Sequence, residues 1–308
     1  MPEGFSTNRR GLLKCMMWGS AGVLWTMSGG VPRALRLDGS AAAATPGELR
    51  FVQISDTHIG FKNPAVNGDP AATLNDALAK IKAGPKPAFM LHTGDVSHLT
   101  KPEEFDMAAQ LLKAANLETY YVPGEHDTIN DDGKSFFERF GHSKNPGGWY
   151  SFDQGGVHFV GLINVVGLKA GGQGHLGNEQ IEWLEDDLKG KTASTPIVVF
   201  THMPLWAVAP EWGWGTDDAE PALAYLKRFG SVTVLNGHIH QVIQKVEGNI
   251  TLRTAYSTAF PQAAAGTPGA SPGPLKVPAE RLKSMLGLRH VDIVLDKGVT
   301  LNDASLAG

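Results

Sequence analysis

Short apolar segments alternate with longer amphipathic segments over most of the chain. Five nearly continuous apolar runs, typical of strands that are buried on both faces, cover residues 49–55, 88–93, 119–123, 197–201 and 232–236. Segments in which apolar residues recur at helical spacing cover residues 70–83, 102–115, 133–140, 178–189 and 218–229. This alternation predicts an α/β fold.

Three other segments have the pattern of β-hairpins. They cover residues 149–164, 241–254 and 289–302, and each has a glycine-containing turn near its middle. We expect these hairpins to form a second sheet that packs on the first. Residues 261–279 are rich in Pro, Gly and Ala, and this composition predicts a loop.

Composition excludes several classes of protein. Of the 308 residues, 42% are hydrophobic and 19% are charged, which excludes a disordered or fibrous chain. The formal net charge of −4 gives no electrostatic basis for binding nucleic acid. A single cysteine excludes a disulfide framework and a thiolate zinc site. The 11 histidines therefore become the candidate metal ligands.

The first 44 residues differ from the rest of the chain. Arg9 and Arg10 precede a moderately apolar stretch at 15–31 and four alanines at 41–44. The stretch is too short and too weakly apolar for a stable membrane span, and the whole segment is typical of a twin-arginine export signal. An N-terminal helix that stays anchored on the inner membrane is the alternative.

The export signal predicts the organisation and the location of the protein. We expect residues 1–44 to engage the bacterial twin-arginine translocase and to be removed. Residues 45–308 would then form a single domain without a stable membrane anchor, in the periplasm or outside the cell.

Each of the five apolar runs is followed by residues that commonly bind metals. In chain order these residues are Asp56, His58, Asp95, Glu125, His126, Asp127, His202, His238 and His240. Because the carboxyl ends of strands in an open α/β sheet meet at one crevice, we expect these side chains to converge. Imidazole and carboxylate together suit Zn, Fe and Mn. The donors exceed the needs of one ion and predict a pair of ions about 3.5–4 Å apart.

The motifs and their order resemble the signature of the calcineurin-like metallophosphoesterases. The matching segments, spread over residues 48–255, are Asp56-x-His58, Gly94-Asp95, Gly124-x-His126-Asp127, His202 and Gly237-His238-x-His240. The resemblance implies a sandwich of two sheets flanked by helices. It also implies a dinuclear-metal hydrolase of small phosphate esters, either a phosphomonoesterase or a phosphodiesterase, that attacks phosphorus with a metal-bound hydroxide.

The resemblance assigns a role to each matching residue. Asp56, His58 and His240 would hold the first ion, and Asp95 would bridge the two ions. His202, His238 and residue 125 would hold the second ion. His126 would donate a proton to the leaving oxygen or stabilise the phosphoryl charge, and Asp127 would orient the ring of His126.

Position 125 departs from the family pattern, which usually has Asn there. Glu125 can still be a ligand, but it adds a negative charge. This charge favours an Fe(III)–M(II) pair within the Fe/Mn/Zn class. Alternatively, the longer side chain rotates away from the ions, and the protein is an exported metal-binding accessory protein with weak or no hydrolase activity.

Two features near these motifs have two interpretations each. His98 has the spacing of an active-site histidine in the nuclease branch of the family, or it is an exposed loop histidine. The nuclease interpretation conflicts with the negative charge of the chain. Trp206, Trp212 and Trp214 either line a substrate pocket or cover the core beneath a long loop.

Overall fold

The computed structural model describes most of the chain. The described residues are 23–28, 31–36, 47–168, 170–295 and 297–307. The chain divides into two compact units, Met1–Thr45 and Pro46–Gly308.

The described part of the first unit is an antiparallel hairpin of β1 (Val23–Ser28) and β2 (Val31–Arg36). Arg9, Arg10 and residues 41–44, on which the prediction of an export signal depends, lie outside the described residues. Within the described parts of the chain, no helix has the length and apolar character needed to cross a membrane.

One sheet of the second unit has five strands in the order β13-β12-β3-β4-β5. These strands are β3 (Glu48–Ile54), β4 (Met90–His92), β5 (Thr119–Tyr121), β12 (Gly287–Val294) and β13 (Gly298–Ser305). β3, β4 and β5 are parallel, whereas β12 is antiparallel to both of its neighbours. The carboxyl ends of the three parallel strands therefore lie at the same edge.

The other sheet has six strands in the order β10-β11-β9-β8-β7-β6. These strands are β6 (Tyr150–Gln154), β7 (Val157–Gly161), β8 (Ile197–Phe200), β9 (Val232–Asn236), β10 (Gln244–Glu247) and β11 (Ile250–Thr254). The four central strands are parallel, and β10 and β6 are antiparallel edge strands.

The predicted α/β fold with two sheets is confirmed, but the predicted division of the strands between the sheets is wrong. The hairpins do not form a separate sheet. The β6–β7 and β10–β11 hairpins flank β8 and β9, and the β12–β13 hairpin flanks β3. Each group of buried parallel strands thus gains hydrogen-bonding partners from a hairpin beside it.

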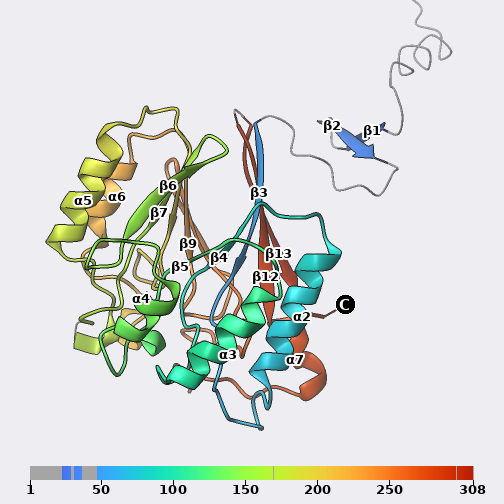
Figure 1. Ribbon diagram of the computed structural model, residues 1–308, viewed down its shortest axis with the longest axis vertical. Coiled ribbons are helices and arrows are strands. Elements are labelled where there is room, and N and C mark those ends of the chain that lie inside the picture. The colour runs from blue at the N-terminus through green and yellow to red at the C-terminus, as the bar shows by residue number, and fades with distance from the viewer. Residues whose placement is uncertain (1–22, 29–30, 37–46, 169, 296, 308) are drawn as a thin grey trace, which may run out of the picture. The chain divides into compact units, whose positions relative to one another are not determined.

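Helices cover the outer faces of the sheets (Figure 1). The helices α2 (Pro70–Ala83), α3 (Pro102–Lys113), α4 (Lys134–Phe140) and α7 (Ala279–Met285) accompany the five-stranded sheet, and α5 (Asn178–Lys189) and α6 (Ala219–Leu226) accompany the six-stranded sheet. The three short 3-10 helices are η1 (Glu125–Asp127), η2 (Ala170–Gly172) and η3 (Pro210–Trp212). Among the helices of the described residues, α7, which begins at the end of the Pro- and Gly-rich segment, and the 3-10 helices were not expected from the sequence.

The core is layered, and β8 shows how the sequence produces the layers. Val198 and Phe200 belong to the apolar cluster between the two sheets, whereas Ile197 and Val199 belong to the cluster beneath α5 and α6. Successive side chains of a strand point to opposite faces, so a continuous apolar run fills both layers. A third cluster lies between β3, β4 and the helices α2, α3 and α4. The result is a helix–sheet–sheet–helix sandwich.

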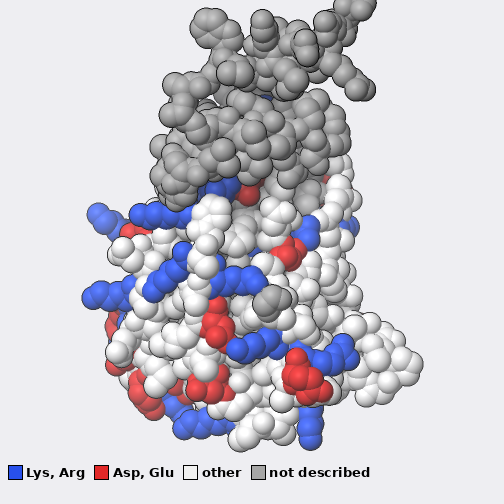
Figure 2. Space-filling view, turned by 90° about the vertical axis from the view of Figure 1, so that its right-hand side faces the viewer, with Lys and Arg blue, Asp and Glu red and all other residues white. Residues whose placement is uncertain are grey.

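The face that carries α2 and α7 has charges of both signs. In Figure 2, Lys and Arg side chains are interspersed with Asp and Glu. One ion pair on these helices joins Lys283 of α7 to Asp76 of α2 at 2.8 Å. Pairs of this kind contribute little to stability when they are exposed, so the apolar layers account for most of the packing.

Candidate metal centre

The seven predicted metal ligands converge at the carboxyl ends of parallel strands from both sheets. Asp56, His58, Asp95 and Glu125 follow β3, β4 and β5, whereas His202, His238 and His240 follow β8 and β9. A hydrogen bond of 3.0 Å from the backbone N–H of His238 to Oδ1 of Asp56 connects the loops of the two sheets. The crevice expected from the sequence therefore lies between the sheets.

The converging side chains form two groups. Within each group, one potential ligand atom per residue lies within 4.8 Å of all the others; the groups are Asp56, His58, Asp95 and His240, and Glu125, His202 and His238. Oδ2 of Asp95 lies 3.4 Å from Nε2 of His58 and also 3.4 Å from Nε2 of His202. This carboxylate thus stands between the two groups, where a bridging ligand is needed.

Backbone carbonyls fix which nitrogen of two of these histidines carries the proton. Nδ1 of His202 lies 2.6 Å from the carbonyl oxygen of Thr93, and Nδ1 of His240 lies 2.6 Å from that of Phe260. A carbonyl oxygen only accepts hydrogen bonds, so each Nδ1 must donate. Each neutral ring then presents the lone pair of Nε2 to its group, as metal ligation requires.

Several buried polar atoms at the centre make no hydrogen bond of good geometry within the described residues. They are Oδ2 of Asp56, Oδ2 of Asp95, Oε2 of Glu125, Nε2 of His202, and both ring nitrogens of His238. Buried polar atoms in folded proteins nearly always have partners. Lone pairs that converge without a donor fit a bound cation, and this mixture of imidazole and carboxylate fits Fe, Mn or Zn.

Glu125 faces the second group and does not rotate away from it. Its Oε1 lies 2.9 Å from Nδ1 of His238, and its Oε2 lies 2.8 Å from Nε2 of His202. Burial would raise the pKa of Glu125, but His238 and His202 outweigh it and hold the pKa well below the usual range. Similarly, burial opposes protonation of His202, yet Asp95 and Glu125 raise its pKa well above 6.5. The same carboxylates would attract a metal cation.

The backbone at the centre is strained. Asp56, His58, Asp95, His238 and His240 have positive φ values of 53°, 39°, 54°, 69° and 54°, and they are five of the eight such non-glycine residues in the described part of the chain. A non-glycine residue in this region costs roughly 1–3 kcal/mol, and such residues cluster at functional sites. The strain turns successive side chains of these short loops toward the two groups.

Two glycines of the sequence motifs are required by close packing. A Cβ atom added to Gly94 would overlap the ring of His202, and one added to Gly124 would overlap the carboxylate of Asp95. Gly94 also has a φ of 94°, which favours glycine. The Gly-Asp and Gly-x-His-Asp motifs therefore combine a ligand with the space that the neighbouring ligand needs.

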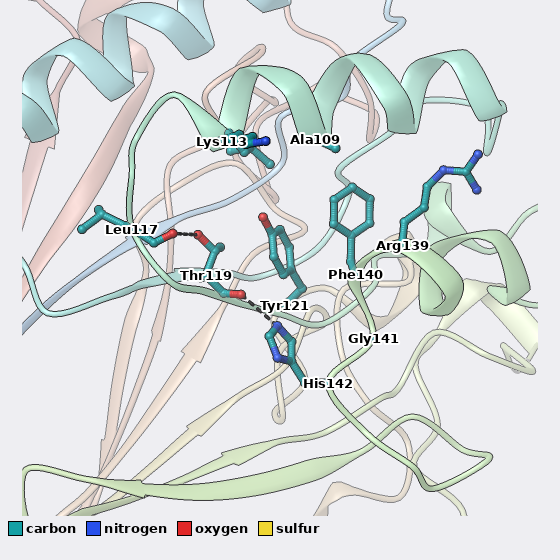
Figure 3. Close-up of a pocket in the computed structure, with 10 residues that line it drawn as sticks. Ala109, Lys113, Leu117, Thr119, Tyr121, Arg139, Phe140, Gly141 and His142 are labelled. Atoms are coloured by element: carbon teal, nitrogen blue, oxygen red, sulfur yellow. Dashed lines mark hydrogen bonds between the residues drawn. The ribbon is translucent and has the colours of Figure 1, made fainter.

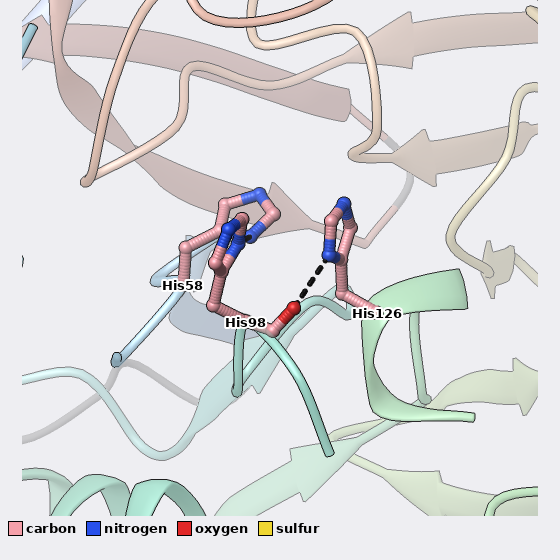
Figure 4. A group of neighbouring side chains, drawn as sticks. All are labelled: His58, His98 and His126. Atoms are coloured by element: carbon pink, nitrogen blue, oxygen red, sulfur yellow. Dashed lines mark hydrogen bonds between the residues drawn. The ribbon is translucent and has the colours of Figure 1, made fainter. Parts of the chain in front are cut away.

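The ring of His126 is held differently from the sequence-based expectation. Its Nδ1 lies 2.7 Å from the backbone carbonyl oxygen of His98 (Figure 4). Asp127 does not orient this ring; its carboxylate instead accepts hydrogen bonds from the backbone N–H groups of Val96, Ser97 and Gly124. The reason is that η1 directs the two neighbouring side chains to different sides. Asp127 thus supports the two loops that carry Asp95 and His126.

The electrostatic surroundings of the two outer histidines differ. Burial opposes protonation of His126, but Asp95 and Glu125 outweigh it and raise its pKa. Burial, together with the neighbouring His126, lowers the pKa of His98 from 6.5 to about 4. The rings of His98 and His126 stack, with centroids 4.8 Å apart and planes at 15°. His98 is therefore part of the centre, although it is not one of the seven converging ligands.

Other candidate residues contribute to packing. Trp214 is fully buried against Ile239, which lies between His238 and His240, and Trp212 packs edge-on against Trp214. Trp206 is partly buried and contacts the cluster beneath α5 and α6. Trp214 thus covers the core and supports the loop that carries two of the predicted ligands.

A second histidine–carboxylate group lies outside the centre. Nδ1 of His175 lies 2.7 Å from Asp217 and 3.2 Å from Asp218. The carboxylate of Asp218 also accepts the backbone N–H groups of Leu176 and Gly177, both at 2.8 Å. These hydrogen bonds hold Asp218 in a turn, and none of the three residues belongs to the seven predicted ligands.

A cavity of about 300 Å³ lies between α3, β5 and α4 (Figure 3). Thr119, Tyr121 and His142 line one part of it, and Nε2 of His142 lies 2.8 Å from the carbonyl oxygen of Thr119. Arg139, also in its wall, is already paired with Asp106 at 3.0 Å. No residue that lines this cavity belongs to the metal centre, so it is not the place where a substrate would meet the ligands.

The groups that hydrogen-bond the ring nitrogens facing away from the metal centre could not be predicted from the sequence. The partners of His202 and His240 are backbone carbonyls, and every residue has one. His98 had a detectable signal, because its spacing from Asp95 suggested that it reaches the centre. The sequence did not indicate that its carbonyl contacts His126.

The fold and this centre define a class of protein, the metallophosphoesterases. The family model for calcineurin-like phosphoesterases matches residues 49–242, more than half of the chain, and this protein belongs to that family. It is a metal-dependent hydrolase of phosphate esters.

Individual relatives agree with this membership. The chain is 26% identical to a probable glycerophosphodiester phosphodiesterase of Arcobacter nitrofigilis, over 67% of this chain and 77% of the relative. It is also 26% identical to a 3′,5′-cyclic-nucleotide phosphodiesterase of Nostoc, over 69% and 79%. A dimetal phosphatase from Danio rerio has the same fold, with a TM-score of 0.64, 14% identity, and coverage of 85% of this chain and 98% of that one.

Proposed function

We propose that the converging side chains hold two metal ions and that the protein hydrolyses small phosphodiesters. The first ion would be held by Asp56, His58 and His240, the second by Glu125, His202 and His238, and Asp95 would bridge them. The observation that carries the proposal is the set of buried, unpartnered lone pairs directed into the two groups. The choice of diesters is supported by two relatives whose names describe phosphodiesterases.

The bound ions would polarise the phosphoryl oxygen and lower the pKa of the attacking water. The residues of the chain supply the remaining functions. His126 keeps its Nδ1 proton on the carbonyl of His98, which leaves Nε2 for the leaving oxygen. A ring protonated at both nitrogens can donate from Nε2 while this backbone hydrogen bond remains in place.

Glu125 bears on the identity of the metals. Three carboxylates, those of Asp56, Asp95 and Glu125, surround the two groups where the family pattern has two carboxylates and an amide. The extra negative charge balances more positive charge, which favours one trivalent and one divalent ion. We therefore propose an Fe(III)–M(II) pair, which elemental analysis of protein from its native host would test.

Hydrolysis of two chromogenic esters tests the activity. Bis(p-nitrophenyl) phosphate and p-nitrophenyl phosphate are supplied to protein loaded with Mn, Zn or Fe, and the diester is expected to react faster. Asp95→Asn serves as the matched control, because it removes the bridging charge with little change of shape. Protein that retains two ions yet hydrolyses neither ester is instead a metal-binding accessory protein.

We also propose that the protein is exported by the twin-arginine translocase to the periplasm or beyond. The support is the sequence alone, with Arg9 and Arg10 ahead of the apolar stretch. The double variant Arg9→Lys, Arg10→Lys keeps the positive charge and is expected to remain unprocessed in the cytoplasm. Cell fractionation with antibody detection measures this, and normal processing of the double variant would refute export by this route.

A further inference from the structure

His58 differs from two other predicted histidine ligands in the partner of its outer nitrogen. His202 and His240 direct Nδ1 to backbone carbonyls. Nδ1 of His58 instead faces Nδ1 of His98 at a distance of 3.3 Å. Figure 4 shows the side chains of His58 and His98 next to each other, with the ring of His126 close to both. The outer partner of this one ligand is therefore a side chain that substitution can remove.

The position of Nε2 of His58 determines where its proton lies. Nε2 is 3.2 Å from Nε2 of His240 and 3.4 Å from Oδ2 of Asp95, within the first group of ligands. A histidine that binds a metal through Nε2 must be deprotonated there, so the single proton of the neutral ring lies on Nδ1. That N–H requires an acceptor, and the atom that faces it is Nδ1 of His98.

His98 is itself held on several sides. Its backbone N–H and that of Leu99 donate to Oε2 of the buried Glu104, at 3.1 and 2.7 Å. The ring of Phe61 packs edge-on against the ring of His98, with centroids 5.2 Å apart. The other face of the His98 ring stacks on His126, and its carbonyl accepts from Nδ1 of His126. The ring therefore has a fixed position from which it can act on His58.

We propose that His98 is a positioning residue of the metal centre: its Nδ1 accepts the Nδ1 proton of His58 and thereby fixes the orientation and tautomer with which His58 binds the first ion. The same residue holds the ring of His126 through its carbonyl. This inference rests on the ligand assignment proposed above. Loss of an outer-shell hydrogen bond of this kind typically weakens metal binding by about 10–100-fold.

Two substitutions separate the hydrogen bond from the packing. His98→Phe keeps a planar ring that stacks on His126 but has no acceptor. His98→Asn loses most of the ring but places an amide oxygen near the position of Nδ1. His290→Asn is the matched control, because His290 is a partly buried histidine on β12 outside the centre. Neither His98 variant alters the backbone carbonyl that contacts His126.

The readout is the affinity of each of the two ions, measured with Zn²⁺ by competition against a chelator. In His98→Phe, the dissociation constant of one ion is expected to rise about 10–100-fold while the other changes little, and His98→Asn and the control are expected to stay near the wild-type value. Three results would overturn the inference: wild-type affinity in His98→Phe, equal losses of affinity in the His98→Phe and His98→Asn variants, or an equal loss of affinity for both ions in His98→Phe. If wild-type protein binds no metal, the proposed function fails as well. If wild-type protein binds two ions and only the difference in affinity between His98→Phe and His98→Asn is missing, the inference about His98 fails and the proposed function stands.

Discussion

Two buried histidine environments in this protein have opposite consequences. At the metal centre, Nδ1 of His202 donates to the carbonyl of Thr93, and its Nε2 makes no hydrogen bond of good geometry, although it lies 2.8 Å from Oε2 of Glu125. In the six-stranded sheet, Nδ1 of His158 lies 2.8 Å from Asp153 and its Nε2 lies 2.7 Å from Asp187. A backbone carbonyl accepts a hydrogen bond from one ring nitrogen and leaves the lone pair of the other nitrogen available. Two carboxylates can accept hydrogen bonds from both ring nitrogens when the ring is doubly protonated.

The acceptors around an imidazole therefore decide what it can do. Both ring nitrogens of His158 face carboxylates, and the residue connects β6, β7 and α5 through these two partners. The ring of His202 has a free nitrogen that is directed at carboxylates. Loss of a histidine that is held by two carboxylates, such as His158, should affect stability. Loss of a histidine that directs a nitrogen into the metal centre, such as His202, should affect metal binding and catalysis. Substitutions can test this division directly.

The largest expected effect is that of His126→Ala on turnover. The N–H at Nδ1 of His126 is held by a backbone carbonyl, and His126 is not among the seven proposed ligands, although its ring lies close to Asp95 and Glu125. Both ions should therefore remain bound when the ring is removed. Loss of a positioned proton donor typically reduces the rate by about 10²–10⁴-fold. Steady-state kinetics with the diester and metal analysis of the same samples measure both properties. Loss of an ion would make His126 a ligand and would contradict its assignment.

The next effect is that of His158→Leu on stability. The carboxylate of Asp187 is largely buried and would keep only its hydrogen bond from Ser151, at a cost of about 1–3 kcal/mol in the free energy of unfolding. Metal content and turnover should not change. Asp153→Asn is the control, because the side chain of Asp153 is 65% exposed and its pair should contribute no more than about 1 kcal/mol. Urea titrations give both values, and a change in metal content in His158→Leu would contradict the division.

Glu125→Asn should have a moderate effect on anion binding. The substitution restores the family pattern and removes one negative charge beside His202 and His238. Inhibition by inorganic phosphate should strengthen by roughly tenfold, because a nearby like charge no longer repels the anion. The metal pair should also shift toward two divalent ions. Unchanged inhibition and unchanged metals would show that Glu125 has no electrostatic role at the centre.

The sequence predicted most of the elements and the ligands because both follow from the same physical pattern. A strand buried on both faces, such as β8, needs a continuous apolar run, and the ligands directly follow the ends of such runs. The pairing of strands left no comparable pattern. β3 pairs with β12, which lies more than 200 residues later in the chain, through backbone groups that all residues share.

The finer arrangement of the centre depends on contacts that residue types do not encode. The expectation that Asp127 orients His126 came from their adjacency, but η1 separates the two side chains. Likewise, the orientation of Glu125 could not be decided from the length of its side chain. Its surroundings decide it, because His202 and His238 come from strands of the other sheet.

An effect that is visible only in the pH dependence of stability concerns His92, a histidine with neither a metal group nor a carboxylate pair. It lies in β4, is fully buried, and its Nε2 is 3.2 Å from Oγ1 of Thr57. Burial lowers its pKa from 6.5 to about 3. Between these values the unfolded chain binds a proton at His92 and the folded chain does not, so this residue contributes stability above pH 6.5 that is lost as the pH falls through this range.

His92→Gln removes this term while it keeps a polar side chain near Thr57. In metal-free protein, the slope of the free energy of unfolding against pH between 6.5 and 4 should become shallower by up to one proton, about 1.4 kcal/mol per pH unit. His142→Gln is the control, because His142 is only partly buried. Equal slopes for His92→Gln and wild type would mean that His92 takes up its proton in the folded state. A protonated His92 would need an acceptor at each ring nitrogen, and the contact of Nε2 with Thr57 supplies only one.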